Sequence, residues 1–326
     1  MFPWRQSAMS RRRSRAVLSP SLSLLFALVA GACGSDDPSP VSGASTARTS
    51  APDPGRSLKI SAIPDQDPAK LATINSTMAS YLAGALGVKV EYVPVTDYAA
   101  SVSLFRTGDL DMVFFGGLTG VQARLQAPGA TLLAQRDIDD AFQSIFVANS
   151  GSGIGPVTEA GQLSALKGKR FTFGSESSTS GRLMPEYFLD QAGLSSEKDF
   201  TGQPGYSGSH DKTIDLVQAG TYDAGALNLQ VWKTRKAAGT VDLTKVTELF
   251  TTPPYRDYHW VAGAKTNERF GAGFTDKVRD ALLALDYANP EHVKLLDNYG
   301  AKKFLATNVG NYAQIESIGR KLKLIT

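Results

Sequence analysis

Cysteine is nearly absent from this chain of 326 residues, in which Cys33 is the only one. A chain with one cysteine forms no internal disulfide, so Cys33 is either a free reactive thiol or has a specific function. Histidine is scarce as well, because only His210, His259 and His292 occur and no two of them have the spacing of metal ligands. We therefore expect neither a disulfide framework nor a metal site.

Catalytic motifs are also missing. The sequence contains no H-E-x-x-H, no G-x-S-x-G and no phosphate-binding P-loop. Residues 209–212 match S-x-x-K, but the partner motifs of that mechanism are absent. These absences argue against an enzyme and against a bound cofactor. An enzyme on the same fold is kept as a minor alternative.

The N-terminal segment is basic and then apolar. The first 15 residues carry five arginines and no acidic residue, and residues 16–32 follow as an apolar run. That run is shorter than the stretch of about 20 apolar residues that a transmembrane helix needs. A basic start, a short apolar middle and small residues at the end predict a secretory signal over residues 1–32. Arg12 and Arg13 hint at twin-arginine export, although the residues after them fit that motif poorly.

The end of the apolar run, Leu-Val-Ala-Gly-Ala-Cys over residues 28–33, resembles the lipobox of bacterial lipoproteins. The resemblance implies that Cys33 is acylated, becomes the new N-terminus and anchors the protein on the extracytoplasmic side of the cell membrane. More than one lipid chain is what stable anchoring needs. The sequence departs from the pattern at Ala30, where Leu is usual. The alternative is an ordinary secreted protein cleaved after an A-x-A-like site.

Charge and composition change after Cys33. Five of the 34 basic residues precede it and all 31 acidic residues follow it, which leaves 29 basic against 31 acidic residues, a net charge of −2. Nothing in this balance suggests nucleic-acid binding. Residues 33–56 are rich in Ser, Pro, Ala, Gly and Asp and have no apolar period, so we predict a disordered tether there. Residues 57–326 are long enough for two lobes.

Strand and helix patterns alternate after the tether. Residues 67–86 place Leu71, Ile74, Met78 and Leu82 on one helical stripe that ends at Gly87. A second helix is predicted over residues 97–107. Strands separated by helices predict an α/β fold with parallel sheets. The predicted strands are 58–63, 88–93, 111–115, 170–174, 224–227 and 258–262.

One pattern occurs twice. Residues 104–111 and 216–223 each read as a helix end, a glycine and then an aspartate that leads into an apolar strand. Two copies of this unit indicate two lobes built alike, with a cleft between them. The alternative is that such junctions are common in any α/β protein.

A hydroxyl-rich loop follows the predicted strand 170–174. Residues 175–180 contain five hydroxyl side chains in six positions, and a helix is predicted from about residue 182. Such a loop directs backbone N–H groups and hydroxyl donors, with the positive end of a helix dipole, toward one point. This chemistry suits a small anion, although serines can also serve only as helix caps. Segments 114–120, with Gly116 and Gly117, and 63–68 follow other strands and could reach the same point.

These segments resemble the phosphonate/phosphite-binding family of periplasmic binding proteins, and most of all its branch labelled selenate-binding. The resemblance covers nearly all of 57–326 and implies a type II fold of two Rossmann-like lobes with the ligand between them. It places the first lobe at 57–148 and 259–326, the second at 149–258, and the crossings near residues 146–150 and 258–261. The matching segments are 61–65, 92–98, 108–117, 118–125, 171–181, 208–210 and 253–255.

The resemblance also implies ligand-binding residues. Tyr98 and His210 are expected to donate from opposite lobes, although His210 equally suits a helix start. Asn228 stands where the phosphonate branch carries an acid that reads a ligand amine, which favours a bare oxyanion. Arg136 is expected to supply charge or to brace Asp137. The anion itself is expected on Ser177, Ser178, Thr179, Ser180 and Gly181, with backbone donors from Gly116 and Gly117.

The identity of the oxyanion depends on a proton. A buried carboxylate needs a donor from its ligand, because two facing acceptors are costly when desolvated. If Asp137 or Asp257 faces the cleft, protonated phosphate or phosphite is favoured; if only donors line it, sulfate or selenate is favoured. We expect a monomeric, lipid-anchored binding protein that delivers the oxyanion to the permease subunits of an ABC importer. The alternative is a sensor that presents its bound state to a membrane receptor.

Overall fold

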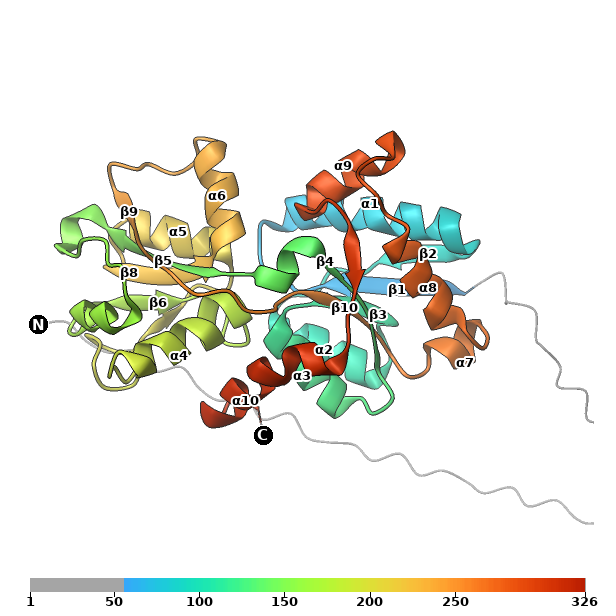
Figure 1. Cartoon of the computed structure of the whole chain (residues 1–326), viewed down its shortest axis with the longest axis horizontal. Coiled ribbons are helices and arrows are strands. Elements are labelled where there is room, and N and C mark those ends of the chain that lie inside the picture. The colour runs from blue at the N-terminus through green and yellow to red at the C-terminus, as the bar shows by residue number, and fades with distance from the viewer. Residues whose placement is uncertain (1–55, 326) are drawn as a thin grey trace, which may run out of the picture. The chain divides into compact units, whose positions relative to one another are not determined.

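Two β-sheets with flanking helices form the part of the chain that the computed structural model describes, residues 56–325 (Figure 1). The predicted signal, Cys33 and the predicted tether up to residue 55 lie outside the described residues. The first sheet has six strands in the order β11-β4-β10-β3-β1-β2, and the second has five in the order β7-β6-β8-β5-β9. The α/β fold of two lobes is thus confirmed.

The strands of the first sheet come from both ends of the described chain. They are β1 (Ser57–Ala62), β2 (Lys89–Tyr92), β3 (Met112–Phe115), β4 (Thr131–Arg136), β10 (His259–Ala262) and β11 (Phe304–Ala306). β1 pairs in parallel with β2 and β3, whereas β10 runs antiparallel between β3 and β4, and β11 is antiparallel to β4. The sheet is therefore mixed rather than parallel.

The second sheet is built from one continuous stretch. Its strands are β5 (Ser144–Asn149), β6 (Phe171–Phe173), β7 (Gly205–Tyr206), β8 (Ala224–Asn228) and β9 (Val246–Thr251). β6 is parallel to β7 and β8, and β5 is antiparallel to β8 and β9. The prediction of parallel sheets was wrong at β5, β10 and β11, because a change of lobe returns the chain in the opposite direction.

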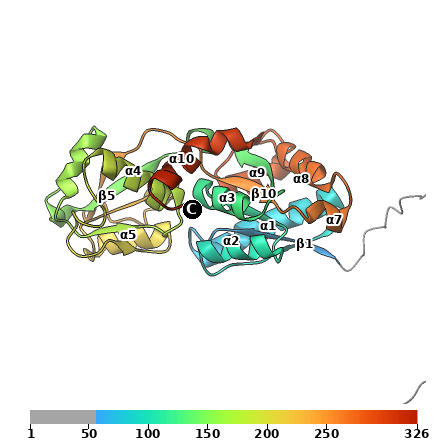
Figure 2. The same cartoon turned by 90° about the horizontal axis from the view of Figure 1, so that it is seen from below.

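Helices cover both sheets. In the first lobe they are α1 (Pro68–Leu86), α2 (Tyr98–Thr107), α3 (Gly117–Gln126), α7 (Thr266–Phe270), α8 (Phe274–Leu283), α9 (Pro290–Tyr299) and α10 (Ala313–Lys321). In the second they are α4 (Met184–Gln191), α5 (His210–Gln218) and α6 (Leu229–Ala237). Seen from below, α10 lies between α3 and α4 (Figure 2).

Local signals in the sequence explain where helix α1 begins and ends. The Asp67 side chain accepts a hydrogen bond from the Lys70 N–H, and Pro68 occupies the first turn. Gly87 ends the helix in the left-handed conformation and donates its N–H to the Ala83 carbonyl. The predicted stripe of Leu71, Ile74, Met78 and Leu82 is buried, and its last three residues pack into the core with the strands of the first sheet.

The repeated unit is present in both lobes. Helix α2 ends at Gly108 and helix α5 is followed by Gly220, both with positive φ. The aspartate of each unit then accepts a backbone N–H from the neighbouring strand: Asp111 from Lys59 and Asp223 from Arg170, both at 2.8 Å. The same short motif therefore positions β3 in one lobe and β8 in the other.

Two segments connect the lobes. The first runs from Arg136 through a short helix, Asp137–Ala141, to β5, and the second runs from Thr251 to His259. They pair where Phe142 and Tyr255 exchange backbone hydrogen bonds of 2.7 and 2.8 Å. The first crossing lies earlier than the expected residues 146–150, because β5 pairs along its whole length with strands of the second sheet.

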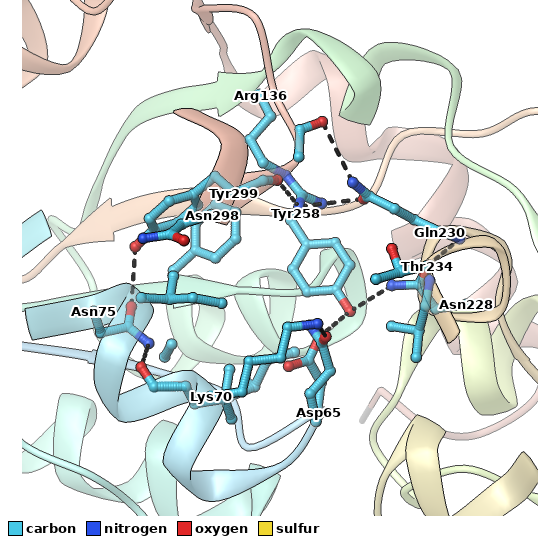
Figure 3. Close-up of a pocket in the computed structure, with 18 of the residues that line it drawn as sticks. Asp65, Lys70, Asn75, Arg136, Asn228, Gln230, Thr234, Tyr258, Asn298 and Tyr299 are labelled. Atoms are coloured by element: carbon cyan, nitrogen blue, oxygen red, sulfur yellow. Dashed lines mark hydrogen bonds between the residues drawn. The ribbon is translucent and has the colours of Figure 1, made fainter. Parts of the chain in front are cut away.

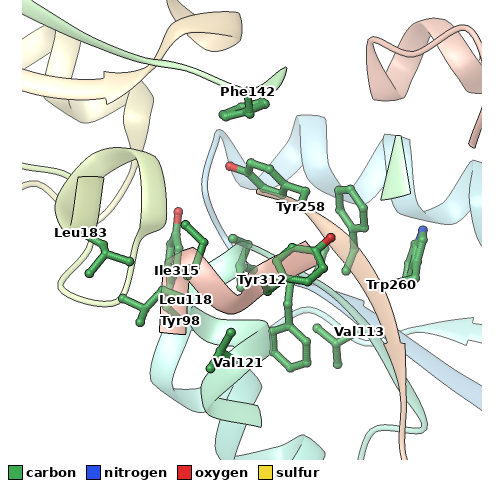
Figure 4. Packing of buried hydrophobic residues seen from close by; sticks show 14 of the residues in the cluster. Tyr98, Val113, Leu118, Val121, Phe142, Leu183, Tyr258, Trp260, Tyr312 and Ile315 are labelled. Carbon is green, nitrogen blue, oxygen red and sulfur yellow. The ribbon is translucent and has the colours of Figure 1, made fainter. Parts of the chain in front are cut away.

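Buried side chains from both lobes meet in one core. Leu118 of α3 and Ile315 of α10 lie close to Leu183, which ends the loop before α4 (Figure 4). Tyr98 and Tyr258 lie in the same cluster and carry hydroxyl groups into an otherwise apolar region. This junction between the lobes is where the polar residues predicted for the site come together.

Candidate functional site

The hydroxyl-rich loop is buried and tightly turned. Ser178, Thr179 and Ser180 are each at most 2% exposed. The Ser178 Oγ accepts the Gly181 N–H at 2.9 Å, and the Gly181 carbonyl accepts the Gly174 N–H at 2.8 Å. Ser178 thus serves as the helix cap that was the alternative to a ligand role. Ser177 is only half buried and lies at the edge of the loop.

Four buried polar atoms near this loop have no hydrogen-bond partner among the described residues. They are Tyr98 Oη, Ser180 Oγ, His210 Nε2 and Asp257 Oδ2. They come from the start of α2, the hydroxyl-rich loop, the start of α5 and the second crossing segment. An unpaired buried polar atom costs about 1–3 kcal/mol. A set of four at one junction indicates a place built to bind a polar ligand.

Close approaches at two glycines show which parts of the chain meet at this junction. A Cβ atom on Gly181 would lie 3.2 Å from His210 Cε1 and 3.0 Å from Ser178 Oγ. A Cβ atom on Gly116 would lie 3.2 Å from Thr179 Oγ1 and 3.3 Å from Asp257 Oδ1. The glycines therefore let the first lobe, the second lobe and the crossing segment approach one another. We call Tyr98, Ser180, His210 and Asp257 the polar cluster.

Asp257 brings the only carboxyl group to the polar cluster. Its Oδ1 accepts the Gly117 N–H at 2.8 Å, which leaves Oδ2 free. Burial raises the pKa of Asp257 to about 7; the Gly117 N–H and the Thr179 hydroxyl oppose the rise, and nearby Asp139 adds to it. Asp137, the other candidate, instead accepts backbone N–H groups from Ile138 and Lys302 outside the cluster.

Two neutral groups supply donors to the polar cluster. His210 Nδ1 accepts the Asn228 N–H at 3.4 Å, so the proton of the neutral ring is assigned to Nε2, the free atom. Burial lowers the pKa of His210 to about 4, which keeps the ring uncharged at neutral pH. The backbone N–H of His210 also donates to the Asp65 carbonyl, so the residue forms a hydrogen bond at the start of α5, and its role toward a ligand stays a prediction. Burial raises the pKa of Tyr98 well above its usual value, and its phenol therefore stays a donor.

Other predicted residues act one step away from the cluster. The Gly117 N–H donates to Asp257, and the Leu118 N–H donates to Thr179 Oγ1 at 2.9 Å across the two lobes. The Gly116 carbonyl accepts the Gly120 N–H inside α3. The backbone N–H groups in the first turn of α3 thus fix the side chains of Asp257 and Thr179.

Arg136 does not face the polar cluster. Its guanidinium group forms a two-pronged pair with Asp139 at 2.7 Å to each oxygen, so it braces Asp139 rather than Asp137. Three aromatic rings surround it, with Tyr258 nearest at 4.8 Å. The pair lies at the first crossing, where it holds the two connecting segments together, since the Asp139 carbonyl also accepts the Asp257 N–H.

A cavity of about 360 Å³ adjoins the cluster on the side of α1, α6 and α9 (Figure 3). Asn228 and Arg136 are the only predicted residues that line it. Asn228 caps α6 by accepting the Gln230 N–H at 2.7 Å, and its side-chain amide donates to Tyr258 Oη at 3.3 Å. Tyr258 donates in turn to Asp65 at 2.7 Å. All three residues line the cavity, and the Asn228 N–H links it to the polar cluster through His210 Nδ1.

Sequence reasoning did not include Asp65 and Tyr258 in the site. Segment 63–68 was expected near the ligand without singling out Asp65, and Tyr258 falls in the predicted strand 258–262, where an apolar role is the default. Their hydrogen bond joins segments 193 positions apart, and no local pattern reports such a contact. Within residues 56–325 no group of His, Cys, Asp and Glu side chains could hold a metal ion. Nor is any helix of that part long and apolar enough to cross a membrane.

The sequence and the fold are similar to those of known proteins. Residues 60–312 match the profile of the periplasmic phosphonate substrate-binding proteins of ABC transporters. The chain is 48% identical over 269 residues to a probable ABC transporter phosphite-binding protein, PhnD1, of Prochlorococcus marinus, covering 82% of this chain and 90% of that protein. It is 29% identical over 219 residues to the phosphate-import protein PhnD of Mycolicibacterium smegmatis, covering 64% of each chain.

Solved structures give the same picture. The structure of Prochlorococcus marinus PhnD1 in complex with methylphosphonate matches with a TM-score of 0.81 and 47% identity, covering 84% of this chain and all of that one. A binding component of a Pseudomonas aeruginosa ABC phosphonate transporter matches with a TM-score of 0.71 at 19% identity, over 82% of this chain and 86% of the other. The second likeness speaks for the fold alone.

Proposed function

Because the chain belongs to the family of periplasmic phosphonate substrate-binding proteins of ABC transporters, we propose that it captures a small protonated phosphorus oxyanion such as phosphite. The bound oxyanion is then passed to the permease subunits of its importer. The observation that carries this proposal is the free Oδ2 of Asp257 beside three donors.

The proton balance of the polar cluster favours phosphorus over sulfur and selenium. Phosphate and phosphonates carry a hydroxyl near neutral pH, and phosphite does so in its monoanionic form, which is partly populated there, whereas sulfate and selenate are fully ionised. Once ionised, Asp257 Oδ2 would accept the hydroxyl of such a ligand, and with a pKa of about 7 the ionised form is substantially populated at neutral pH and above. Two facing acceptors without that proton would be costly in a buried site. Tyr98, Ser180 and His210 supply donors to the remaining oxygens.

The relatives support the same class of ligand. One is named for phosphite, the other for phosphate import, and the PhnD1 structure contains methylphosphonate. The selenate expected from the branch label is disfavoured by the Asp257 carboxyl. Four other predicted residues support the site indirectly: Ser178, Thr179, Gly116 and Gly117. Some of their hydrogen-bonding groups fix the hydroxyl-rich loop and Asp257 and are therefore not directed at the ligand.

Titration calorimetry tests the ligand class. The purified protein is titrated at pH 7 with phosphite, phosphate, methylphosphonate, sulfate, selenate and selenite. We expect phosphite and its phosphorus relatives to bind at least about tenfold more tightly than sulfate and selenate, the lower end of what a hydrogen bond to a charged group contributes. Binding of none of the six, or tighter binding of sulfate or selenate, would contradict the proposal.

We also propose that the protein works as a monomer tethered outside the cytoplasm through acylated Cys33. The position of the cysteine after an apolar run, followed by a polar segment, supports this anchor. Replacing the cysteine, Cys33→Ser, is expected to move the exported protein from the membrane fraction to the soluble fraction. Equal membrane retention of the variant would remove the anchor and leave the ligand proposal standing.

A further inference from the structure

One side chain of the second lobe forms a hydrogen bond with the backbone of the first lobe. Gln230, in the first turn of α6, donates its side-chain N–H to the carbonyl of Gly300, which ends α9, at 3.3 Å. Its Oε1 lies 3.5 Å from Nη1 of Arg136 (Figure 3). Both partners belong to the first lobe or to the crossing segment that leaves it, so these contacts exist only while the lobes are close together.

The contact of Gln230 with the end of α9 requires a glycine at residue 300. A Cβ atom on Gly300 would overlap Gln230 Nε2, so no larger residue fits at position 300 while Gln230 keeps its place. The clash would involve the tip of a flexible side chain, so an alanine at residue 300 would displace Gln230, in addition to the strain of its positive φ.

The other partner of Gln230 is held rigidly. Arg136 is fixed by its pair with Asp139, by a 2.8 Å bond from Nη1 to the Tyr299 carbonyl and by the surrounding rings. A fixed guanidinium beside a free carbonyl forms a preorganised receptor for one amide side chain. The receptor also lines the cavity of about 360 Å³ that lies between the lobes.

Gln230 is linked to the polar cluster through two bonds. Its own N–H is held by the Asn228 side chain at 2.7 Å, and the Asn228 N–H is bonded to His210 Nδ1 at 3.4 Å. The other nitrogen of the His210 ring belongs to the polar cluster. A ligand that fixes His210 therefore also fixes the start of α6, from which Gln230 reaches the first lobe.

We propose that Gln230 is a positioning residue that holds the two lobes closed over the ligand by docking on Gly300 and Arg136. It does not touch the ligand, and its contribution is to the lifetime of the closed state, since hinged domains open to release what they bind. The role in ligand release rests on the proposed function, whereas the role in lobe closure does not.

The test compares two variants that remove the docking with one matched control. Gln230→Ala deletes the side chain, and Gly300→Ala fills the space in which that side chain lies. Gly87→Ala is the control, because Gly87 also ends a helix with φ near that of Gly300, +67° against +63°, and has no atom within 4 Å of its Cβ position. It reproduces the backbone strain of Gly300→Ala without touching Gln230.

Two readouts separate the possible results. Stopped-flow binding of phosphite is expected to show dissociation rates about two- to fivefold higher in Gln230→Ala and Gly300→Ala, as for the loss of one modest hydrogen bond, with unchanged association rates. The fraction of closed molecules, measured by energy transfer between dyes on Lys277→Cys and Lys198→Cys in a Cys33→Ser background, is expected to fall in the same two variants. Both readouts should stay at the parent values in Gly87→Ala.

Unchanged closed fractions in Gln230→Ala and Gly300→Ala would overturn the proposal, as would an equal effect of Gly87→Ala. If the parent protein bound no phosphite, the proposed function would fail, but the closed fraction would still decide whether Gln230 holds the lobes together. If phosphite bound and both dissociation rates stayed at the parent value, the role of Gln230 in ligand release would be wrong and the proposed function would stand.

Discussion

At the scale of single residues, Asp257 decides which anions the polar cluster accepts. In Asp257→Asn the amide oxygen can still accept the Gly117 N–H, and the amide nitrogen then faces the ligand as a donor. The site would contain donors only. We therefore expect weaker binding of phosphite, and a ratio of phosphite to sulfate affinity that falls by about tenfold or more, as for loss of a hydrogen bond to a charged group.

Competition calorimetry with phosphite and sulfate at pH 7 measures this ratio. Ser180→Ala is the matched control, because it removes a donor that any tetrahedral oxyanion would use and so weakens both ligands alike. If Asp257→Asn kept the parent ratio of phosphite to sulfate affinity, Asp257 would not be the group that distinguishes protonated from fully ionised ligands.

The same carboxyl makes stability depend on pH. The pKa of Asp257 is about 7 in the folded protein against 3.8 for an unperturbed aspartate. Between these values the folded state retains a proton that the unfolded chain has lost, so the stability contribution is present below pH 4 and is lost as pH rises through 7. At 1.36 kcal/mol per pH unit, the destabilisation by Asp257 at pH 8 reaches at most about 4 kcal/mol.

Asp257→Asn cannot ionise and should escape this loss. We expect its free energy of unfolding, relative to the parent, to increase between pH 4.5 and pH 8. Urea unfolding of both unliganded proteins at the two pH values measures the difference, and the other buried carboxyls cancel in the comparison. A pH-independent difference would show that Asp257 has an ordinary pKa.

At the scale of elements, the loop between β6 and α4 depends on the absence of one side chain. A Cβ atom on Gly181 would lie 3.0 Å from Gly174 Cα and from Ser178 Oγ. The first of these atoms is backbone and cannot turn aside. We expect Gly181→Ala to lower the free energy of unfolding by about 1–3 kcal/mol, as overpacking does, and to weaken oxyanion binding.

Chemical unfolding and calorimetry check this prediction. Gly161→Ala is the control, because no atom lies within 4 Å of its Cβ position. Gly181→Ala with parent stability and parent affinity would mean that Gly174 and the loop separate at no cost, and that the turn is not needed to hold Ser180 in the cluster.

Elements with local signals could be predicted from the sequence. Asp67, Pro68 and Gly87 mark α1 within one residue, and the hydroxyls after β6 mark the loop. The partner of Arg136 could not be found in this way. A turn of 3-10 helix brings Asp139 back to Arg136, so the residue three positions on forms the pair instead of the adjacent Asp137.

At the scale of the whole molecule, the repeated helix–Gly–Asp unit indicated two lobes, whereas the division of the first lobe between both ends of the chain was implied only by the resemblance. An apolar run such as 258–262 predicts a strand but does not report its neighbours or direction. Strand β10 lies in the middle of the first sheet and pairs with β3, whose residues precede it by more than 140 positions. Pairings of this range are set by tertiary packing, as is the hydrogen bond from Tyr258 to Asp65.

The position of β10 also has a consequence for the order of folding. All strands of the second sheet lie within residues 144–251, whereas the first sheet lacks a central strand until residues 259–262 have returned to it. Because closing a longer loop costs more chain entropy and long-range pairing is slow, the second lobe should fold first. The first lobe would then fold while the second lobe, inserted between its two segments, is already formed.

In the protein without residues 1–32, which contain Trp4, tryptophan reports on each lobe separately. Trp232 of α6 is buried in the second lobe and Trp260 of β10 is buried in the first. During refolding from urea, we expect the fluorescence of Trp232, followed in Trp260→Phe, to change before that of Trp260, followed in Trp232→Phe. Simultaneous changes would mean that the lobes fold as one unit. The reverse order would mean that the ends of the chain find each other before the segment between them has folded.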